Sequence, residues 1–290
     1  MDILITSDGP DTFERAVEYT LLFADDASLT LLYPYQSDRE RKEKLADLEH
    51  LADKIRLQTA CSVRIVMRPG YQDDTLLQDI QEQSYDLVVF GVHLQSRLNN
   101  LRPKHDAREL ARRISIPLLV VFPRWEKLER ILIWTEGKEP DELALHLAGT
   151  MASQVGARCT VLHVMSQIPL RADAETEDLD RDAQSLMEHE TREGRYLEEA
   201  LATLERSGVP RDECQAVVRH GMTVNEIVKE SQSGDFDLVV MGGVAVHAEK
   251  SWHELRELVQ EDIADQVLAT CKRPVLITRQ PDEKVDWNEM

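Results

Sequence analysis

Five short strand-like phrases occur twice in this chain, in the same order, and this duplication restricts the fold more than any other feature. The matching pairs are DILITSDG and RILIWTEG, LTLLYPY and CTVLHVM, VMRPG and VVRHG, YDLVVFG and FDLVVMG, and IPLLVVFP and RPVLITRQ. Self-similarity over such a length indicates two copies of one structural unit. At 290 residues, the chain is long enough for two domains that each bury a core.

The spacing between matching positions locates the boundaries of the two copies. The offset from the first copy to the second is 128 residues at Ile3 and 151 residues at Gly70. Most of the additional length therefore follows the second strand of the second copy, where an acidic run lies at 171–182. We predict a first domain at 1–124, a second domain at 128–280 and an acidic tail at 281–290.

Helical patterns separate the strand-like phrases. Apolar and small residues recur with the spacing of one buried helix face at Phe13, Ala16, Val17, Thr20, Leu21 and Ala24, and again at Leu45, Leu48, Leu51, Ala52 and Ile55. Asp11 or Thr12 is available to cap the first of these helices. Strands that alternate with such helices favour right-handed crossovers and mainly parallel sheets. We therefore predict an α/β fold of two tandem five-stranded, mainly parallel sheets with helices on both faces.

The predicted strands end in glycines and acids, at the edge where such sheets bind ligands. In open α/β sheets a ligand lies beyond the carboxyl ends of the strands. Glycine at these ends lets the backbone approach a bound group closely. The candidate binding residues at these ends are Asp8, Gly91, Glu136, Gly242 and Gly243.

The charge of the chain excludes one class of partner. A net charge of −20 at pH 7 repels a phosphate backbone, because nucleic-acid binding depends on Lys and Arg displacing counterions. No stretch is both long and apolar enough to span a bilayer. The segment MDILITSDG has an acid where an export signal would have basic residues. We expect a cytoplasmic protein that binds neither nucleic acid nor membrane.

Motifs for metal binding and catalysis are weak. The four cysteines lack CxxC spacing, which favours reduced, packed thiols; they are Cys61, Cys159, Cys214 and Cys271. A metal cluster could be drawn from His247 and His253 with nearby glutamates, but these residues flank the expected start of a helix at an irregular spacing. The sequence contains no P-loop, GxSxG elbow or HExxH pair. We predict no metal site and no catalytic residues.

In the type and order of its phrases, the chain resembles the universal stress proteins in their tandem two-domain form. The resemblance covers nearly the whole chain and is carried by DILITSDG, a second strand of the VLHV type, MRPG and VRHG ahead of helices, DLVVMG, and RPVLIT. It implies a five-stranded α/β domain in each copy, pairing of domains through their last strands, and a role in surviving stress. It also implies that some members bind ATP and others do not.

The prediction of partners rests on the last strand of each copy. IPLLVVFP at 116–123 and RPVLIT at 273–278 are short and apolar, so each is a predicted edge strand that has to be covered. We expect the two strands to pair with each other or with a second chain. An unknown protein partner is also expected.

The second copy departs from the nucleotide motif of the family it resembles. Binding members have Gly-x2-Gly after the fourth strand and then Gly-Ser or Gly-Thr opening the last helix, which together hold phosphate. Gly242 begins such a motif, but Ala245 replaces the second glycine and two carboxylates, Glu261 and Asp262, replace the Gly-Ser pair. Like charges at that point would repel phosphate. A capping box also predicts that the last helix begins near Trp252.

The first copy departs in another way. Leu94 replaces the second glycine after Gly91, and Lys104 lies where binding members have the Gly-Ser pair. Arg102 and Lys104 precede a helix, where cations can hold an anion without glycines. The resemblance places Asp8 where binding members use an acid near the base and ribose. The loop can equally be a solvated basic surface.

These observations lead to one expected function and one alternative. We expect a non-enzymatic stress-response protein that binds a partner protein or a small anion and has degenerate nucleotide sites. The alternative is a module that binds or slowly hydrolyses ATP at the first-copy site. No cofactor is expected under the first interpretation, whereas ATP or another anion is the ligand under the second.

Overall fold

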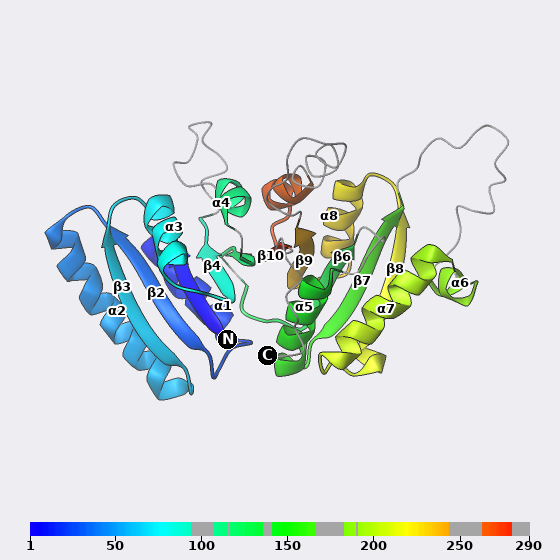
Figure 1. The fold of residues 1–290 in the computed structure, drawn as a ribbon, viewed down its shortest axis with the longest axis horizontal. Helices are drawn as coiled ribbons and strands as arrows, with labels where there is room; N and C mark the ends of the chain where they lie inside the picture. Colours follow the sequence, from blue (N-terminus) through cyan, green and yellow to red (C-terminus); the bar gives the residue numbers. More distant parts are fainter. Residues whose placement is uncertain are drawn as a thin grey trace. The chain divides into compact units, whose positions relative to one another are not determined.

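Two units make up the chain, Met1–Lys127 and Leu128–Met290, and each is described by itself (Figure 1). The computed structural model describes residues 1–93, 107–114, 116–123, 125–135, 141–165, 183–189, 191–243 and 263–279. Among these residues no helix has the length and hydropathy needed to cross a bilayer.

The first unit is a five-stranded parallel sheet in the order β3-β2-β1-β4-β5. Its strands are β1 (Asp2–Ser7), β2 (Ser28–Tyr35), β3 (Ser62–Pro69), β4 (Leu87–Gly91) and β5 (Leu118–Val121). Its helices are α1 (Pro10–Thr20), α2 (Asp38–Gln58), α3 (Gln72–Glu82) and α4 (Ala107–Arg113). From β1 the chain adds β2 and β3 towards one edge of the sheet, and it then returns to the other side of β1 to add β4 and β5. Right-handed crossovers therefore put α1 and α2 on one face and α3 and α4 on the other.

The second unit repeats this order as β8-β7-β6-β9-β10, again with parallel neighbours. Its strands are β6 (Arg130–Thr135), β7 (Arg158–Met165), β8 (Cys214–His220), β9 (Leu238–Gly243) and β10 (Val275–Arg279). Its helices are α5 (Glu142–Val155), α6 (Ala183–Glu188), α7 (Arg192–Arg206), α8 (Thr223–Ser233) and a last helix at 263–270, with a short 3-10 turn, η3, at Arg211–Glu213. The predicted fold class is confirmed.

The central strands read as continuous apolar runs because helices cover both faces of each sheet. Ile3, Leu4 and Ile5 of β1 are fully buried, as are the four residues from Leu87 to Phe90 in β4. All four cysteines are buried and free, as predicted. Cys159 of β7 lies opposite Cys214 of β8 in the strand register, although 55 residues separate them in the chain.

The acid of the repeated phrase ties the amino ends of two neighbouring strands together. In the first unit the backbone NH of Asp2 donates to the Asp86 carboxylate at 2.7 Å. In the second unit the Asp237 carboxylate accepts from the backbone NH groups of Glu129 at 2.8 Å and Arg130 at 3.1 Å. Sequence reasoning treated this acid only as a boundary, although its recurrence in both phrases was a signal.

The start of α1 differs from the prediction. The helix begins at Pro10 and its N-cap, Gly9, makes no side-chain capping bond. Proline suits the first helical position because its missing NH would be unpaired there anyway. The Thr12 hydroxyl instead lies 3.0 Å from an oxygen of Asp8 and 2.8 Å from the Gly9 carbonyl oxygen. The expectation that Asp11 or Thr12 caps this helix is therefore wrong.

Several predictions fall on residues that the structure does not describe. They are the helix start near Trp252, the substitutions at Ala245, Glu261 and Asp262, the histidines His247 and His253, the loop residues Leu94, Arg102 and Lys104, the acidic run at 171–182, and the tail at 281–290.

Candidate functional site

In the first unit, the candidate site is organised by Asp8, which follows β1. Its carboxylate accepts hydrogen bonds from the backbone NH of His93, at 2.8 and 3.1 Å to the two oxygens. The Thr12 hydroxyl lies 3.0 Å from one of these oxygens, and His93 Nδ1 lies 3.3 Å from it. The side chain is only 13% exposed. The carboxylate thus joins the end of β1 to the segment that follows β4.

Gly91 lies at the end of β4 and packs against the start of α1. A Cβ at this position would overlap the carbonyl oxygen of Thr12. The backbone NH of Asp8 also donates to the Gly91 carbonyl oxygen at 3.0 Å. The imidazole of His93 lies over Gly9, where a Cβ would come within 3.1 Å of the ring. Glycine at 91 is therefore explained by the close approach of a helix.

The corresponding edge of the second unit is organised by Asp141, which sequence reasoning missed. Asp141 caps α5, since one of its oxygens accepts from the backbone NH of Ala144 at 3.0 Å. Its other oxygen accepts from the Thr278 hydroxyl at 3.2 Å and lies against Gly242, where it would overlap an added Cβ. Burial of the carboxylate raises the pKa of Asp141 above its usual value. The Pro-Asp sequence ahead of an apolar helix was the signal for this cap.

Two polar side chains on β6 and β7 have atoms without hydrogen-bond partners among the described residues. Thr135 and His163 are register partners on these strands, and each is only 6% exposed. Neither Thr135 Oγ1 nor His163 Nδ1 has a hydrogen-bond partner in the described part of the chain. Burial lowers the pKa of His163, so its imidazole is held in the neutral form. Such groups can hydrogen-bond a water molecule or a small polar ligand.

The predicted binding residues fall in two separate sets. Asp8 and Gly91 are joined by the backbone hydrogen bond in the first unit, whereas Gly242 and Gly243 end β9 and pair with Thr278 and Arg279 of β10. Arg102, Lys104 and Glu136 lie outside the described residues. In the part of the chain that is described, no group of three or more His, Cys, Asp or Glu side chains could hold a metal ion.

Comparison with known proteins decides the family. The model of the universal stress protein family matches residues 127–279, which is more than half of the chain. The chain belongs to the universal stress protein family. The match coincides closely with the second unit, and the first unit has the same strand order. A search of the curated proteins found no match for this chain.

Solved structures similar to this universal stress protein cover both of its units. A universal stress protein from Archaeoglobus fulgidus DSM 4304 is 13% identical with a TM-score of 0.65, and the alignment covers 98% of each chain. A functionally unknown protein from Pseudomonas aeruginosa PAO1 is 18% identical with a TM-score of 0.61, covering 97% of this chain and 94% of that one. At these identities the likeness concerns the fold alone.

Proposed function

We propose that this universal stress protein acts in the stress response as a non-enzymatic binding protein whose strand-end sites do not hold a nucleotide. Membership of the family supports the stress-response role. One observation carries the rest: the Asp141 carboxylate lies against Gly242, at the glycine whose backbone a phosphate would have to approach. The Asp141 side chain occupies the space that a phosphate would need, and in its ionised form it would also repel the phosphate at a cost on the order of several kcal/mol.

The first unit supports the same proposal through a different arrangement. Both oxygens of Asp8 already accept hydrogen bonds from the backbone NH of His93, and one also contacts Thr12. These bonds use both acceptor positions of one oxygen and one position of the other, and the side chain is only 13% exposed, so little of the carboxylate is left for a ribose hydroxyl. Because the bonds hold β1 to the segment after β4, we assign Asp8 a structural role. The proposed activity is therefore the binding of a partner protein or small anion elsewhere on the molecule.

Equilibrium dialysis with labelled ATP and Mg²⁺ tests this proposal. We expect no binding at about 1 mM nucleotide, the concentration at which even a weak site with a Kd of about 1 mM would be half filled. We also expect no release of phosphate over hours. Saturable ATP binding by the parent protein would overturn the proposal.

Two variants assign any ATP binding to one of the units. Binding at the first-unit loop should fall with added salt and in the double variant Arg102→Ala, Lys104→Ala, because exposed charges act through a screened field. That result would establish the alternative function. Binding that survives in this variant but is lost in Gly242→Val would instead place the nucleotide in the second unit.

A further inference from the structure

Two of the four buried cysteines face each other across neighbouring strands of the second unit. Cys159, the second residue of β7, and Cys214, the first residue of β8, are register partners. Partners in register on parallel strands point to the same face of the sheet, and the strands lie about 4.8 Å apart. A disulfide joins residues whose Cα atoms are about 4.4 to 6.8 Å apart. The strand pairing therefore places these two residues within the range that a disulfide can bridge.

The two thiols also lie close enough to influence each other. Burial raises the pKa of Cys159, and the neighbouring Cys214 raises it further. Burial raises the pKa of Cys214 to about 11, an effect that Arg211 opposes and Glu205 of α7 reinforces. The pair therefore lies on the face of the sheet that α7 covers. Cys159 is fully buried and Cys214 is 6% exposed, so Cys214 is the thiol nearer to solvent.

The first unit has an apolar pair at the same two positions. Cys159 corresponds to Leu29 in the repeated strand phrase, and Cys214 corresponds to Val63, since each lies seven residues before the glycine that ends its phrase. Leu29 and Val63 are register partners on β2 and β3. The fold is therefore compatible with aliphatic side chains at both positions, and the facing thiols are a property of the second unit.

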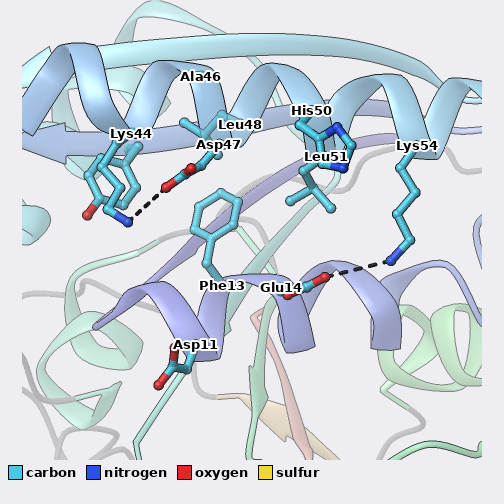
Figure 2. A pocket seen from close by; sticks show the side chains of 11 residues that line it. Asp11, Phe13, Glu14, Lys44, Ala46, Asp47, Leu48, His50, Leu51 and Lys54 are labelled. Carbon is cyan, nitrogen blue, oxygen red and sulfur yellow. Dashed lines mark hydrogen bonds and ion pairs between the residues drawn. The ribbon is translucent and has the colours of Figure 1, made fainter.

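The corresponding face of the first unit has an open groove between α1 and α2 instead (Figure 2). Its volume is about 480 Å³, and its lining includes Phe13 and Tyr33, whose ring centroids are 6.2 Å apart. Its charged side chains form two ion pairs, Lys44 with Asp47 at 3.0 Å and Lys54 with Glu14 at 3.7 Å. Among the described residues this lining includes no cysteine. The same face thus carries facing thiols in the second unit alone.

We propose that Cys159 and Cys214 form a disulfide when hydrogen peroxide or another hydroperoxide is present, and that this bond fastens β8 to β7. Because β8 is the outermost strand of the described second unit, its amino end can open locally more easily than a central strand. Such opening brings Cys214 to a small oxidant while β7 stays in the sheet. The pair lies at the amino ends of the strands, so this chemistry is independent of the strand-end site at the carboxyl ends.

The oxidation balances in two steps. The Cys214 thiol loses its proton to solvent, and its sulfur attacks one oxygen of hydrogen peroxide; the O–O bond breaks, and the departing hydroxide takes a proton from solvent to form water. Cys159 Sγ then attacks the sulfur of the Cys214 sulfenic acid, the S–O bond breaks, and the departing hydroxide takes the Cys159 thiol proton to form a second water. Two thiols are oxidised by two electrons, and the peroxide is reduced to two water molecules.

Peptide mapping by mass spectrometry under non-reducing conditions tests the pairing. The full chain is treated with hydrogen peroxide at about pH 8.5, where more of each thiol is ionised than at neutral pH. We expect a single disulfide, Cys159 with Cys214, that dithiothreitol reverses, while Cys61 and Cys271 remain thiols. The same treatment in urea should give mixed pairs, because the unfolded chain does not hold the two strands in register. Absence of the Cys159–Cys214 peptide from the folded protein, or the same mixture as in urea, would overturn the proposal.

Two variants test whether the register selects the pair. Cys214→Val introduces the residue of the matching position in the first unit, so it keeps the site apolar. Cys271→Ala is the matched control, since Cys271 is a buried cysteine of the same unit. We expect no disulfide in Cys214→Val and an unchanged Cys159–Cys214 disulfide in Cys271→Ala. Pairing of Cys159 with another cysteine in Cys214→Val, as readily as with Cys214 in the parent, would refute the role of the register.

Hydrogen exchange measures whether the bond fastens the strand. We expect amides of β8 to exchange at least about tenfold more slowly in the oxidised protein, because the bond restricts local opening. Amides of β3, the matching strand of the first unit, should exchange at the same rate before and after oxidation. Exchange of β8 that is unaffected by a mapped Cys159–Cys214 disulfide would contradict the proposed fastening.

Discussion

The helix pair α1–α2 of the first unit and the pair α5–α7 of the second unit hold the same place in the same topology, but the side chains at their contacts differ. In the second unit, Gly149 lets α5 approach Ser207, the residue that follows α7, so closely that a Cβ at position 149 would come within 2.5 Å of the Ser207 Cβ. In the first unit, Phe13 and Tyr33 form the floor of an open space of about 480 Å³. The comparison teaches that strand order fixes which helices are neighbours, whereas the side chains at the contact fix their separation.

The same comparison extends to the strand beneath the helices. Tyr33 of β2 and His163 of β7 occupy matching positions in the phrases LTLLYPY and CTVLHVM. Tyr33 is partly exposed and lines the groove, whereas His163 is buried. One position therefore supplies a partly exposed groove residue in one unit and a buried neutral imidazole in the other.

The largest expected difference between the units concerns the acid that ties the strands. Asp237 is fully buried and accepts two backbone hydrogen bonds, whereas Asp86 is exposed and accepts one from Asp2. Asp237→Ala removes a fully buried acceptor from two part-buried NH groups and should lower the free energy of unfolding of the second unit by about 3 kcal/mol. Asp86→Ala should cost about 1 kcal/mol or less because water can replace the carboxylate. Urea titrations of both variants measure this, and equal losses would contradict the comparison.

The closed helix contact is tested by overfilling it. Gly149→Val places two methyl groups against Ser207 and should lower the free energy of unfolding by about 2 kcal/mol, in the range typical of overpacking. Adding Ser207→Gly removes the side chain that is met and should recover part of the loss. Urea titration of the single and double variants gives the coupling between the two sites. If Ser207→Gly merely adds its own cost, the helices are not in the close contact described.

The smallest expected effect is a pH dependence of stability that comes from His163 of the second unit. The matching residue of the first unit, Tyr33, should not contribute to it. Burial lowers the pKa of His163 below 6.5, so the unfolded chain binds a proton more readily than the folded one. Its contribution to stability is present above pH 6.5 and is lost as the pH falls from there towards the folded-state pKa. The loss can reach about 1.4 kcal/mol per pH unit.

Comparison of His163→Gln with the parent protein isolates this contribution. Urea midpoints at about pH 7.5 and pH 5.5 should differ less in the variant than in the parent, because glutamine does not titrate near these values. The matching variant Tyr33→Phe should leave the difference between the two midpoints unchanged, since burial raises the pKa of Tyr33 from its ordinary value of 10. Parent-like behaviour of His163→Gln would show that other groups cause the acid sensitivity.

The fold could be predicted from the sequence because strand phrases and helical periodicity recur in a fixed order. The apolar spacing correctly identified Phe13, Ala16 and Val17 as a buried face of α1. The start of α1 was wrong, because Asp11 and Thr12 are common capping residues and the effect of Pro10 at the first helical position was not considered. Local rules therefore predicted the elements better than their exact ends.

The candidate sites were less accessible to sequence reasoning, because their contacts join distant parts of the chain. The strand-end rule located Asp8 and Gly91, but the hydrogen-bond donor for Asp8 is the backbone of His93, 85 residues away. Asp141 and Gly242 meet across 101 positions of the sequence. The groove depends on the distance between two helices, which no periodicity encodes.

The hydrogen bonds of Asp86 and Asp237 to neighbouring strands also determine how long a chain segment each unit has to close. Asp86 meets a residue 84 positions away, whereas Asp237 meets residues 107 and 108 positions away. In a simple loop-closure treatment, the entropic cost rises with the logarithm of the segment length, so the longer segment costs only about 0.2 kcal/mol more at 25 °C. By this measure the second unit carries some 23 additional residues between its tied strands almost without loss of stability.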